Sequence, residues 1–319
     1  MRRRLLLLAI FALAAAAASS ANAAKSSGGH AGALYRFGLG TRTLGFAGAV
    51  VSLAHDPTTV LVNPAGAAFG GRGALIGSHT SMALDRSINV LGFGRQLDPR
   101  AGFSIAWVNA GVDGLVGYDG NGNVTGTLDD SENTIAMSFG SRFGRVAAGV
   151  TAKWYRYHLS TRSSSGWAFD AGFMAEPFSG FRVGAAIRDL VGKLVWTTNR
   201  EEGQIPIEDA FPTTLAAGVS YQILPLRTSV AADYERVQEE GEYLHFGVSW
   251  QVVRQLRLRA GYRWLGVRAS AHKATPTAGA TLTTNLMAIG FGDSQVSFDY
   301  AVLNEPLGLV HSLGVKFDF

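Results

Sequence analysis

The chain contains no cysteine, so a fold held together by disulfides is excluded. Charged residues make up only 16% of the 319 residues, and the formal net charge of +4 gives no sign of a nucleic-acid partner. Proline occurs 9 times against 40 glycines, and no stretch rich in proline and serine separates two halves. The composition therefore favours one large domain with a short N-terminal appendage.

Long hydrophobic runs are also missing. The longest, from Leu5 to Ala18, has 14 apolar residues, fewer than the roughly 20 that span a bilayer as a helix. Three arginines precede this run, and Ala21-Asn22-Ala23 offers small residues to signal peptidase. We predict a secretory signal peptide at 1–23 rather than a membrane anchor. Any later residence in a membrane must then come from a closed β-sheet, which satisfies every backbone hydrogen bond internally.

What the chain does contain is period-two alternation. In 295–302, Val296, Phe298 and Tyr300 alternate with polar residues, as in a strand with two different faces. About fourteen such segments follow one another between 73 and 319, joined by connections that are tight and long in turn. We predict the longer connections at 110–132, 157–165, 190–212, 236–241 and 265–281. An even strand number with short turns at one end and longer loops at the other is typical of outer-membrane β-barrels.

Aromatic residues end many of the outward-facing series, where an interfacial girdle is expected. These are Trp107, Trp154, Tyr221, Trp250 and Trp264. The last strand alternates through Leu313, Val315 and Phe317 and stops at Phe319, as in substrates of the bacterial barrel-assembly machinery. With the signal peptide, this pattern predicts Sec-type export to the outer membrane of a Gram-negative bacterium, with outer-membrane lipid and the assembly machinery as partners.

Alternation also predicts a band of charge inside the barrel, because the outward series of three successive strands forces charged residues into the lumen. The band comprises Asp233, Glu235, His245, Arg257, Arg259 and Arg263. This band has two interpretations. In the first it is a structural ladder, in which buried charges pair across a narrow interior. In the second it is a binding site for an anionic head group near the arginines.

The segment from Gly38 to Ala68 is too rich in glycine and alanine to be a membrane strand. Asp56 before Pro57 is a good helix start, and Pro64 disfavours helix at the preceding residue, so we predict a short helix from 57 to 62. Arg42 would need a carboxylate in a crowded lumen, and Asp56 is our candidate. The predicted layout is a signal peptide at 1–23, a plug at 24–72 and a barrel at 73–319.

This segment resembles the hatch of the FadL/TodX-type outer-membrane transport proteins, including their PorV/PorQ-like branch. The resemblance rests on a G-x-R-x-x-G-x-x-G-A pattern, an aspartate position and an Asn-Pro-Ala-Gly box. The matching residues are Gly40, Arg42, Gly45, Gly48, Asp56, Asn63, Pro64, Ala65 and Gly66. The resemblance implies an all-β fold, a single transmembrane antiparallel barrel of about 14 strands with an N-terminal hatch in the lumen.

The resemblance also implies a function: passive uptake of hydrophobic compounds, such as long-chain fatty acids, gated by the hatch. We expect the connection at 190–212 to be an external loop that captures the ligand through exposed apolar residues. Those residues are Trp196, Ile205, Ile207 and Phe211. The alternative, from the PorV/PorQ-like branch, is a non-enzymatic adaptor barrel that docks secreted or periplasmic proteins.

Other motifs do not support chemistry. The series Asp119, Asn121, Asn123 imitates a calcium loop, but the glycine and the bidentate glutamate that such a loop needs are absent, which favours a turn-rich external loop. His245 and Ser249 share a strand face, yet about 13 Å separates residues four apart on a strand, too far for a nucleophile and its base. We predict no enzyme activity, no metal and no cofactor.

Overall fold

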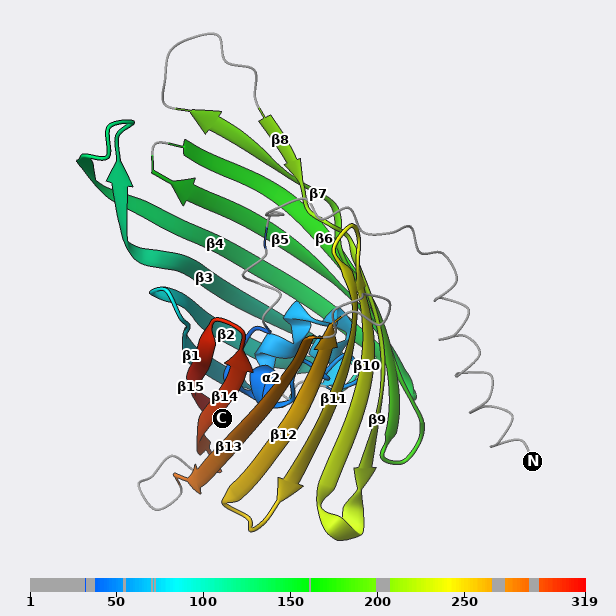
Figure 1. Cartoon of the computed structure of the whole chain (residues 1–319). Coiled ribbons are helices and arrows are strands. Elements are labelled where there is room, and N and C mark those ends of the chain that lie inside the picture. Colours follow the sequence, from blue (N-terminus) through cyan, green and yellow to red (C-terminus); the bar gives the residue numbers. More distant parts are fainter. Residues whose placement is uncertain are drawn as a thin grey trace.

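The computed structural model describes residues 32, 38–53, 56–69, 71, 73–160, 162–198, 207–265, 273–286 and 293–319. The predicted signal peptide, most of the predicted plug before Gly38, and Ile205 lie outside these residues. The described part of the chain forms a closed antiparallel β-barrel of 14 strands (Figure 1). The predicted fold class is therefore confirmed.

The barrel strands follow one another in sequence order, and the sheet closes where the first strand pairs with the last, from Ala74 opposite Asp318 to Ser81 opposite His311. They are β1 (Ala74–Ser81), β2 (Arg86–Asp98), β3 (Ala101–Tyr118), β4 (Val124–Phe143), β5 (Val146–Leu159), β6 (Arg162–Phe178), β7 (Phe181–Thr198), β9 (Thr214–Ile223), β10 (Thr228–Val237), β11 (Gly241–Gln251), β12 (Leu256–Leu265), β13 (Lys273–Asn285), β14 (Gln295–Glu305) and β15 (Gly308–Asp318). The turn before β10 is a short helical turn, η4 (Leu224–Leu226).

Within the described residues, no helix combines the length and the apolar character needed to cross a membrane.

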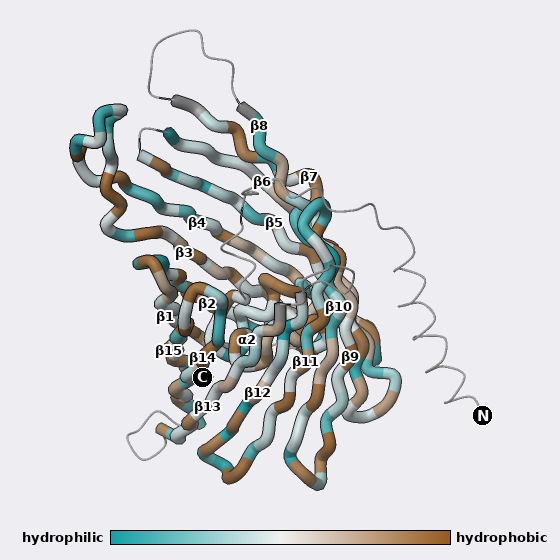
Figure 2. The backbone as a smooth tube through the Cα atoms, in the orientation of Figure 1, coloured by the Kyte–Doolittle hydropathy of each residue, from teal (hydrophilic) through white to brown (hydrophobic). Residues whose placement is uncertain are grey.

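Each barrel strand has one apolar outer face and one small or polar inner face. On β14, Ser297 and Asp299 are buried in the interior, whereas Phe298 and Tyr300 keep 52% and 41% of their surface exposed on the outside. Figure 2 shows the same alternation as brown and pale segments along β9 to β12. Because side chains of a strand point to opposite faces in turn, most of the outward residues form an apolar coat.

The wall is not of equal height. β3 and β4 have 18 and 20 residues, about twice the 9–11 that a tilted strand needs to cross a bilayer, whereas β1 has 8. Figure 1 shows β3 to β7 rising above the rest of the barrel. The predicted long loops at 110–132 and 157–165 are wrong, because strands continue into both, up to a turn at 119–123 in the first and to Leu159 and from Arg162 in the second. Residues 121–129 are exposed on both faces, so their sequence carries no apolar alternation.

The predicted external loop at 190–212 is also partly strand. β7 continues to Thr198, and a short extra strand, β8 (Ile207–Ala210), pairs with it alone. The partnership between β7 and β9 ends at Arg188 opposite Thr214. At this height β7 has two register shifts against β6 and a backbone with positive φ at Asp189 and Val191. Bulges of this kind disrupt the ladder locally and re-aim side chains.

Inside the barrel lies a compact piece of chain that we call the luminal segment, residues 38–53 and 56–69. It contains α2 (Thr41–Gly45) and two 3₁₀ helices, η2 (Pro57–Leu61) and η3 (Pro64–Phe69), which are almost entirely buried. Figure 1 shows these elements in blue, enclosed by the strands. The short helix predicted after Asp56 is confirmed, although it is a 3₁₀ turn: Asp56 Oδ1 accepts a hydrogen bond from the Thr58 backbone N–H at 2.8 Å.

Candidate transport path

The luminal segment rests on a belt of inward-facing glycines in the barrel wall. A Cβ added at most of these positions would collide with the backbone or a side chain of the luminal segment. The belt comprises Gly102, Gly140, Gly149, Gly172, Gly184, Gly247, Gly261 and Gly279, on β3 to β7 and β11 to β13. Only glycine allows backbone to approach backbone so closely.

Sheet register aligns this belt. Gly102 lies opposite Gly140, Gly140 opposite Gly149, and Gly149 opposite Gly172. Four neighbouring strands therefore present glycine at one height, where Pro64 of η3 contacts Gly149 and Gly172. The sequence does show the high glycine content, but the belt is visible only once the register is known.

Polar contacts fix the luminal segment to the wall. The Asn63 side chain donates to the carbonyls of Val51 and Phe173, at 2.7 and 3.1 Å, and its Oδ1 accepts from the Ala65 N–H at 3.1 Å. One amide thus ties two parts of the luminal segment to β6. This gives the predicted Asn-Pro-Ala-Gly box a physical role, because Asn63 is completely buried and all these groups need partners.

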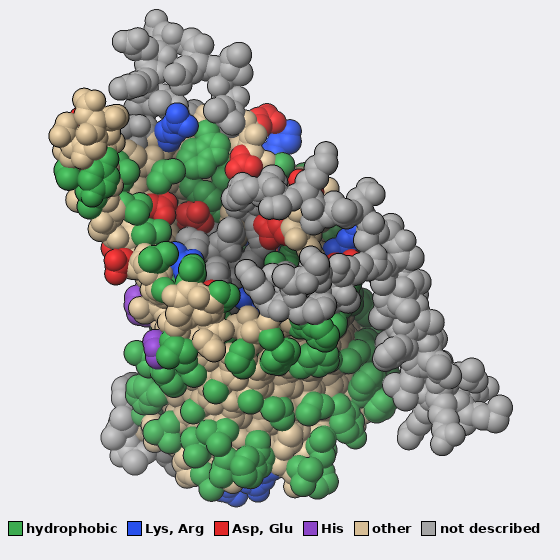
Figure 3. Space-filling view, viewed as in Figure 1, with side chains coloured by type: hydrophobic (Ala, Val, Ile, Leu, Met, Phe, Trp, Pro, Cys, Tyr) green, Lys and Arg blue, Asp and Glu red, His purple; other side chains and the backbone are tan. Residues whose placement is uncertain are grey.

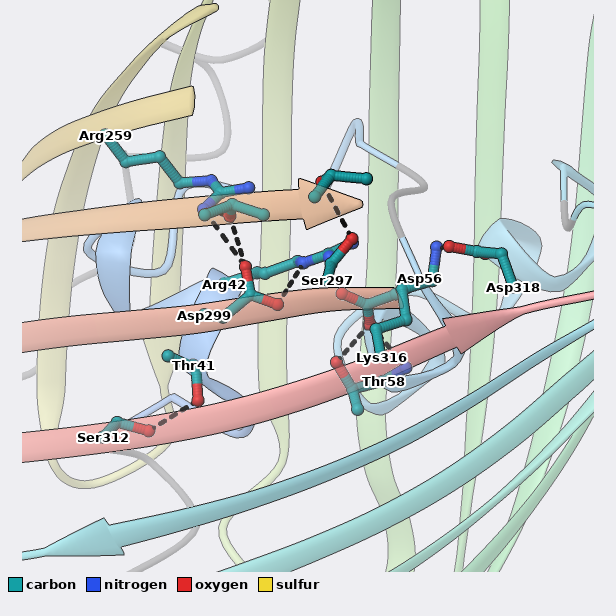
Figure 4. Close-up of polar contacts among 12 residues, drawn as sticks. Thr41, Arg42, Asp56, Thr58, Arg259, Ser297, Asp299, Ser312, Lys316 and Asp318 are labelled. Carbon is teal, nitrogen blue, oxygen red and sulfur yellow. Dashed lines mark hydrogen bonds and ion pairs between the residues drawn. The ribbon is translucent and has the colours of Figure 1, made fainter. Parts of the chain in front are cut away.

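On the opposite side, Arg42 of α2 donates from Nε to Asp299 Oδ2 on β14 at 2.9 Å (Figure 4). The ion pair of Arg42 is thus with Asp299 and not with Asp56, the partner that we expected: Asp56 Oδ1 accepts from the Thr58 hydroxyl and N–H. Nearby, the Thr41 hydroxyl lies 2.8 Å from that of Ser312 on β15. The Arg42 and Thr41 contacts join α2 to β14 and β15, near barrel closure.

The charge environment of Asp56 keeps this carboxyl ionised. Burial by itself would raise the pKa of Asp56, but the positive charge of Arg42, the hydrogen bonds from Thr58 and the positive charge of Lys316 together hold that pKa below its ordinary value. The cap of η2 is consequently a carboxylate, which is the better acceptor for the two Thr58 donors.

The predicted band of luminal charge faces the interior, and it makes hydrogen bonds and ion pairs with the luminal segment and with other strands. Asp233 Oδ2 accepts from the Val51 N–H at 2.7 Å, and His245 Nδ1 lies 2.7 Å from the carbonyl oxygen of Ala47. Two band residues therefore bind the backbone of the luminal segment. Ser249, the other half of the rejected hydrolase pair, accepts from Arg257 instead.

The remaining members are paired across strands that lie apart in sequence. Arg188 of β7 meets Glu235 at 2.6 Å, and Arg263 meets Glu305 of β14 at 3.1 Å. Arg259 donates to the Thr281 hydroxyl at 2.5 Å and lies 3.6 Å from Asp299. These pairs agree with the structural-ladder interpretation. Arg257 is different, because its hydrogen bonds go only to neutral groups among the described residues.

Above the luminal segment, aromatic side chains line the taller wall. The rings of Tyr155 and Phe211 stack with centroids 4.3 Å apart, and Tyr157 packs edge-on to both. Leu194 is completely buried in the same cluster, with Trp196 packed against it. We call this group, Tyr155, Tyr157, Leu194, Trp196 and Phe211, the upper aromatic cluster.

The prediction that 190–212 exposes its apolar residues is thus wrong for Phe211, which is 7% exposed and points inward where the chain passes from β8 to β9. Trp196 is half-buried on β7. Ile207 lies on β8, and its side chain is outside the described part, as is all of Ile205. The strand bulges account for the difference, because they turn this stretch toward the lumen.

Beside the cluster lies a charged group that sequence reasoning did not single out. Lys153 contacts Asp170 at 2.8 Å and Asp189 at 3.0 Å, and the Tyr155 hydroxyl donates to Asp189 at 2.7 Å. The outward Trp154 implied that its neighbours Lys153 and Tyr155 face inward. The inward position of Asp189, in contrast, depends on the bulge in β7, which alternation does not predict. A cavity of about 50 Å³ separates this group from Leu39 and Leu61 of the luminal segment.

Below the luminal segment, at the end of the barrel that carries the tight turns, lies a larger cavity of about 440 Å³ that we call the lower cavity. Its lining is rich in hydroxyl and guanidinium groups, and Phe46 and Leu53 of the luminal segment border it. The lumen therefore has an aromatic compartment above and a polar one below, with the luminal segment between them.

Several solved structures have the same fold as this chain. The CymD monoaromatic hydrocarbon channel superposes with a TM-score of 0.62 at 14% identity, over 88% of this chain and 96% of that one. The toluene transporter TbuX of Ralstonia pickettii gives 0.60 at 16% identity, over 89% and 98%, and a Pseudomonas aeruginosa FadL homologue gives 0.60 at 11% identity, over 87% and 96%. The chain has the fold of these proteins. No family model matches the sequence, and no curated protein does either.

On this barrel, a polar ladder crosses the outer surface of the first four strands. The ladder runs from His79 to Asn89 at 2.8 Å, on to Asn109 at 3.3 Å and to Asn133 at 3.2 Å, where the Trp107 indole N–H also donates. Below it the outer surface is apolar, and Figure 3 shows charged side chains gathered mainly toward the upper end. Amides beside an indole are what a membrane interface favours.

Proposed function

We propose that this chain is an outer-membrane channel for the passive uptake of hydrophobic compounds, with the luminal segment as its gate. The observation that carries the proposal is the position of the luminal segment, between an upper aromatic cluster and a lower polar cavity. An apolar molecule would gain by leaving water for the aromatic cluster, but it cannot continue until the luminal segment shifts.

The comparisons support the same function, because proteins of this fold carry titles such as monoaromatic hydrocarbon channel and toluene transporter. Transport without catalysis also agrees with the luminal groups described here, in which Ser249 and His245 are engaged with other partners. We further propose export by a signal peptide at 1–23 and insertion into the outer membrane of a Gram-negative bacterium through the strand that ends at Phe319.

The deciding experiment is native mass spectrometry of the barrel extracted gently from the outer membrane, followed by uptake of radiolabelled toluene and oleate into proteoliposomes. Retention of a lipophilic molecule, together with uptake that saturates, supports the channel. A variant lacking 38–69 should conduct small ions that the complete barrel excludes. An empty barrel that takes up neither probe contradicts the proposal.

A second candidate function is an adaptor that docks a secreted or periplasmic protein. It is favoured by the tall β3–β4 hairpin, which rises with β5 to β7 above the rest of the wall and exposes Val116, Tyr118 and Val124. A variant in which that hairpin is shortened to the height of β1 would distinguish the two functions. A channel should keep its uptake of toluene, whereas an adaptor should lose a protein that copurifies with the complete barrel.

A further inference from the structure

We propose that the polar ladder on the outer wall is part of a binding site for a phosphorylated glycolipid of the outer leaflet. The site is completed by Trp107 and by Arg156, which lies beside the last amide of the ladder. The proposal rests on the proposed location in the outer membrane. It does not depend on transport, because these side chains lie on the outside of the barrel and not in the lumen.

The first argument is that the polar residues form one row, which we call the outer row. The register places His79 opposite Asn89, Asn89 opposite Asn109, Asn109 opposite Asn133 and Asn133 opposite Arg156. Five neighbouring strands, β1 to β5, therefore present a hydrogen-bonding side chain at one height (Figure 1). Side chains directly opposite each other in antiparallel strands are about 5 Å apart, so one head group can contact several of them.

The second argument is the height of the outer row. Asn133 and Arg156 each lie ten positions from the tight turn between β4 and β5, which begins after Phe143 and ends before Val146. At about 3.3 Å per residue and a strand tilt of about 40°, ten positions correspond to a height of about 25 Å. The apolar band of an outer-membrane barrel is about 25 Å tall, so the outer row lies at the level of the outer head groups.

Directly below the outer row, the wall is apolar and aromatic. The next outward positions on β2 to β5 are Leu91, Trp107, Ile135 and Trp154. Further down, Met137 and Val150 each expose 59% of their surface. Acyl chains can pack on this surface while the head group contacts the outer row.

The third argument is the direction of the hydrogen bonds in the polar ladder. Asn89 Nδ2 donates to Asn109 Oδ1 at 3.3 Å, and Asn109 Nδ2 donates to Asn133 Oδ1 at 3.2 Å. Each amide therefore turns its positive end toward Arg156, and the dipoles of such a chain reinforce one another. The Trp107 indole N–H donates to the same Asn133 oxygen, which holds its ring beneath the amides. The β5 end of the outer row is consequently its positive end.

The fourth argument is the cation at this end. Arg156 is exposed, and in the part of the chain that the structure describes its guanidinium has no hydrogen bond or ion pair. His158, the next outward residue on β5, is exposed as well. An open guanidinium fork beside amide N–H groups has the geometry and the charge to bind a phosphate group.

Carboxylates do not neutralise this end of the outer row. Glu132 belongs to the inward series of β4, and its Oε2 atom is buried. At the outward positions of β3 and β4, the first carboxylates above the row are Asp113 and Asp129, four residues further along each strand. Four residues span about 13 Å, which exceeds the screening length of about 8 Å at physiological salt.

The test is native mass spectrometry of the detergent-solubilised barrel, titrated with lipid A that carries two phosphates, with dephosphorylated lipid A and with phosphatidylglycerol. We expect lipid A to bind at least tenfold more tightly than either of the other lipids. Arg156→Gln should weaken lipid A binding tenfold or more, and Arg156→Lys, which keeps the charge but loses the fork, should give an intermediate affinity. The matched control is Arg254→Gln, which removes an exposed arginine from the tight turn between β11 and β12 and should change nothing.

A second variant, Asn109→Val, interrupts the polar ladder at its centre with a residue that suits a strand, and it should also weaken lipid A binding. Heat-dependent gel mobility establishes that each variant is a folded barrel.

Absence of lipid A binding overturns the proposal, as does binding that survives both Arg156→Gln and Asn109→Val, because the lipid then binds elsewhere on the wall. Equal affinity for phosphatidylglycerol and lipid A overturns the preference for a glycolipid. A barrel that binds lipid A as expected but takes up neither toluene nor oleate supports the site and contradicts only the proposed transport.

Discussion

Arg42 and Asp299, 257 positions apart in the chain, form a buried ion pair that joins the luminal segment to the barrel wall. Because Asp299 also lies near Arg259 and accepts from the Thr281 hydroxyl, one carboxylate holds α2, β12, β13 and β14 together. The luminal segment and the closing strands of the barrel are thus coupled energetically.

Asp299→Asn should therefore destabilise the barrel severely. The substitution removes the carboxylate that two buried guanidinium groups share, and removing one partner of a buried pair costs about 3–5 kcal/mol. Urea unfolding in lipid vesicles measures the change. The control is Glu208→Gln, which breaks the exposed pair between Lys193 and Glu208 and should leave the free energy of unfolding nearly unchanged. Equal losses in the two variants would show that the Asp299 pair is not a structural anchor.

The glycine belt predicts that a single methyl group can displace the gate. In Gly149→Ala the new Cβ would overlap the Pro64 carbonyl, which belongs to the backbone and cannot rotate away. We expect a loss of about 1–3 kcal/mol from overpacking and a higher ion conductance in planar bilayers. Gly120→Ala, at a loop position with open space around it, should leave both unchanged. If the ion conductance of Gly149→Ala equals that of the unsubstituted barrel, the luminal segment keeps its position despite the clash.

The depressed pKa of Asp56 predicts an acid-sensitive gate. Because the pKa of this carboxyl is lower in the folded protein than in the unfolded chain, its stabilising contribution is complete above the unfolded value and is lost as pH falls through the folded one. Protease cleavage within 38–69 should thus accelerate as pH falls below the usual carboxyl range. Other buried carboxylates titrate too, so the measurement is the difference from Asp56→Asn, whose cleavage should be fast already at neutral pH. Matching pH profiles for the two proteins would contradict the prediction.

Local interactions were predictable from the sequence, and those that depend on barrel register were not. The Asp56 cap joins residues two apart, so the sequence pattern identified it correctly. The inward and outward faces of β14 followed from alternation in the same way. The partner of Arg42, in contrast, depends on which strand closes the barrel beside α2, and a nearby aspartate was the wrong candidate.

Alternation also fails where the environment no longer differs between the two faces. Residues 121–129 meet water on both sides, so nothing in their sequence separates a strand from a loop, and the height of β3 and β4 was missed. Phe211 was misplaced for a related reason: an apolar residue in a connection between strands can face solvent or the lumen, and only the bulges near Asp189 show that this one faces the lumen.

The stacking of Phe211 on Tyr155 leads to the last prediction, which concerns ligand size. Phe211→Ala removes a ring from the upper aromatic cluster, so the compartment widens where Gly192 and Leu194 now meet the ring. We expect naphthalene uptake to rise relative to toluene uptake, at a stability cost of about 3–5 kcal/mol for a buried phenylalanine. The matched control, Phe143→Ala, removes an exposed ring at the end with the tight turns and should preserve the ratio. If the ratio is unchanged in Phe211→Ala, the cluster is a structural core, and the path of the ligand lies along another part of the wall.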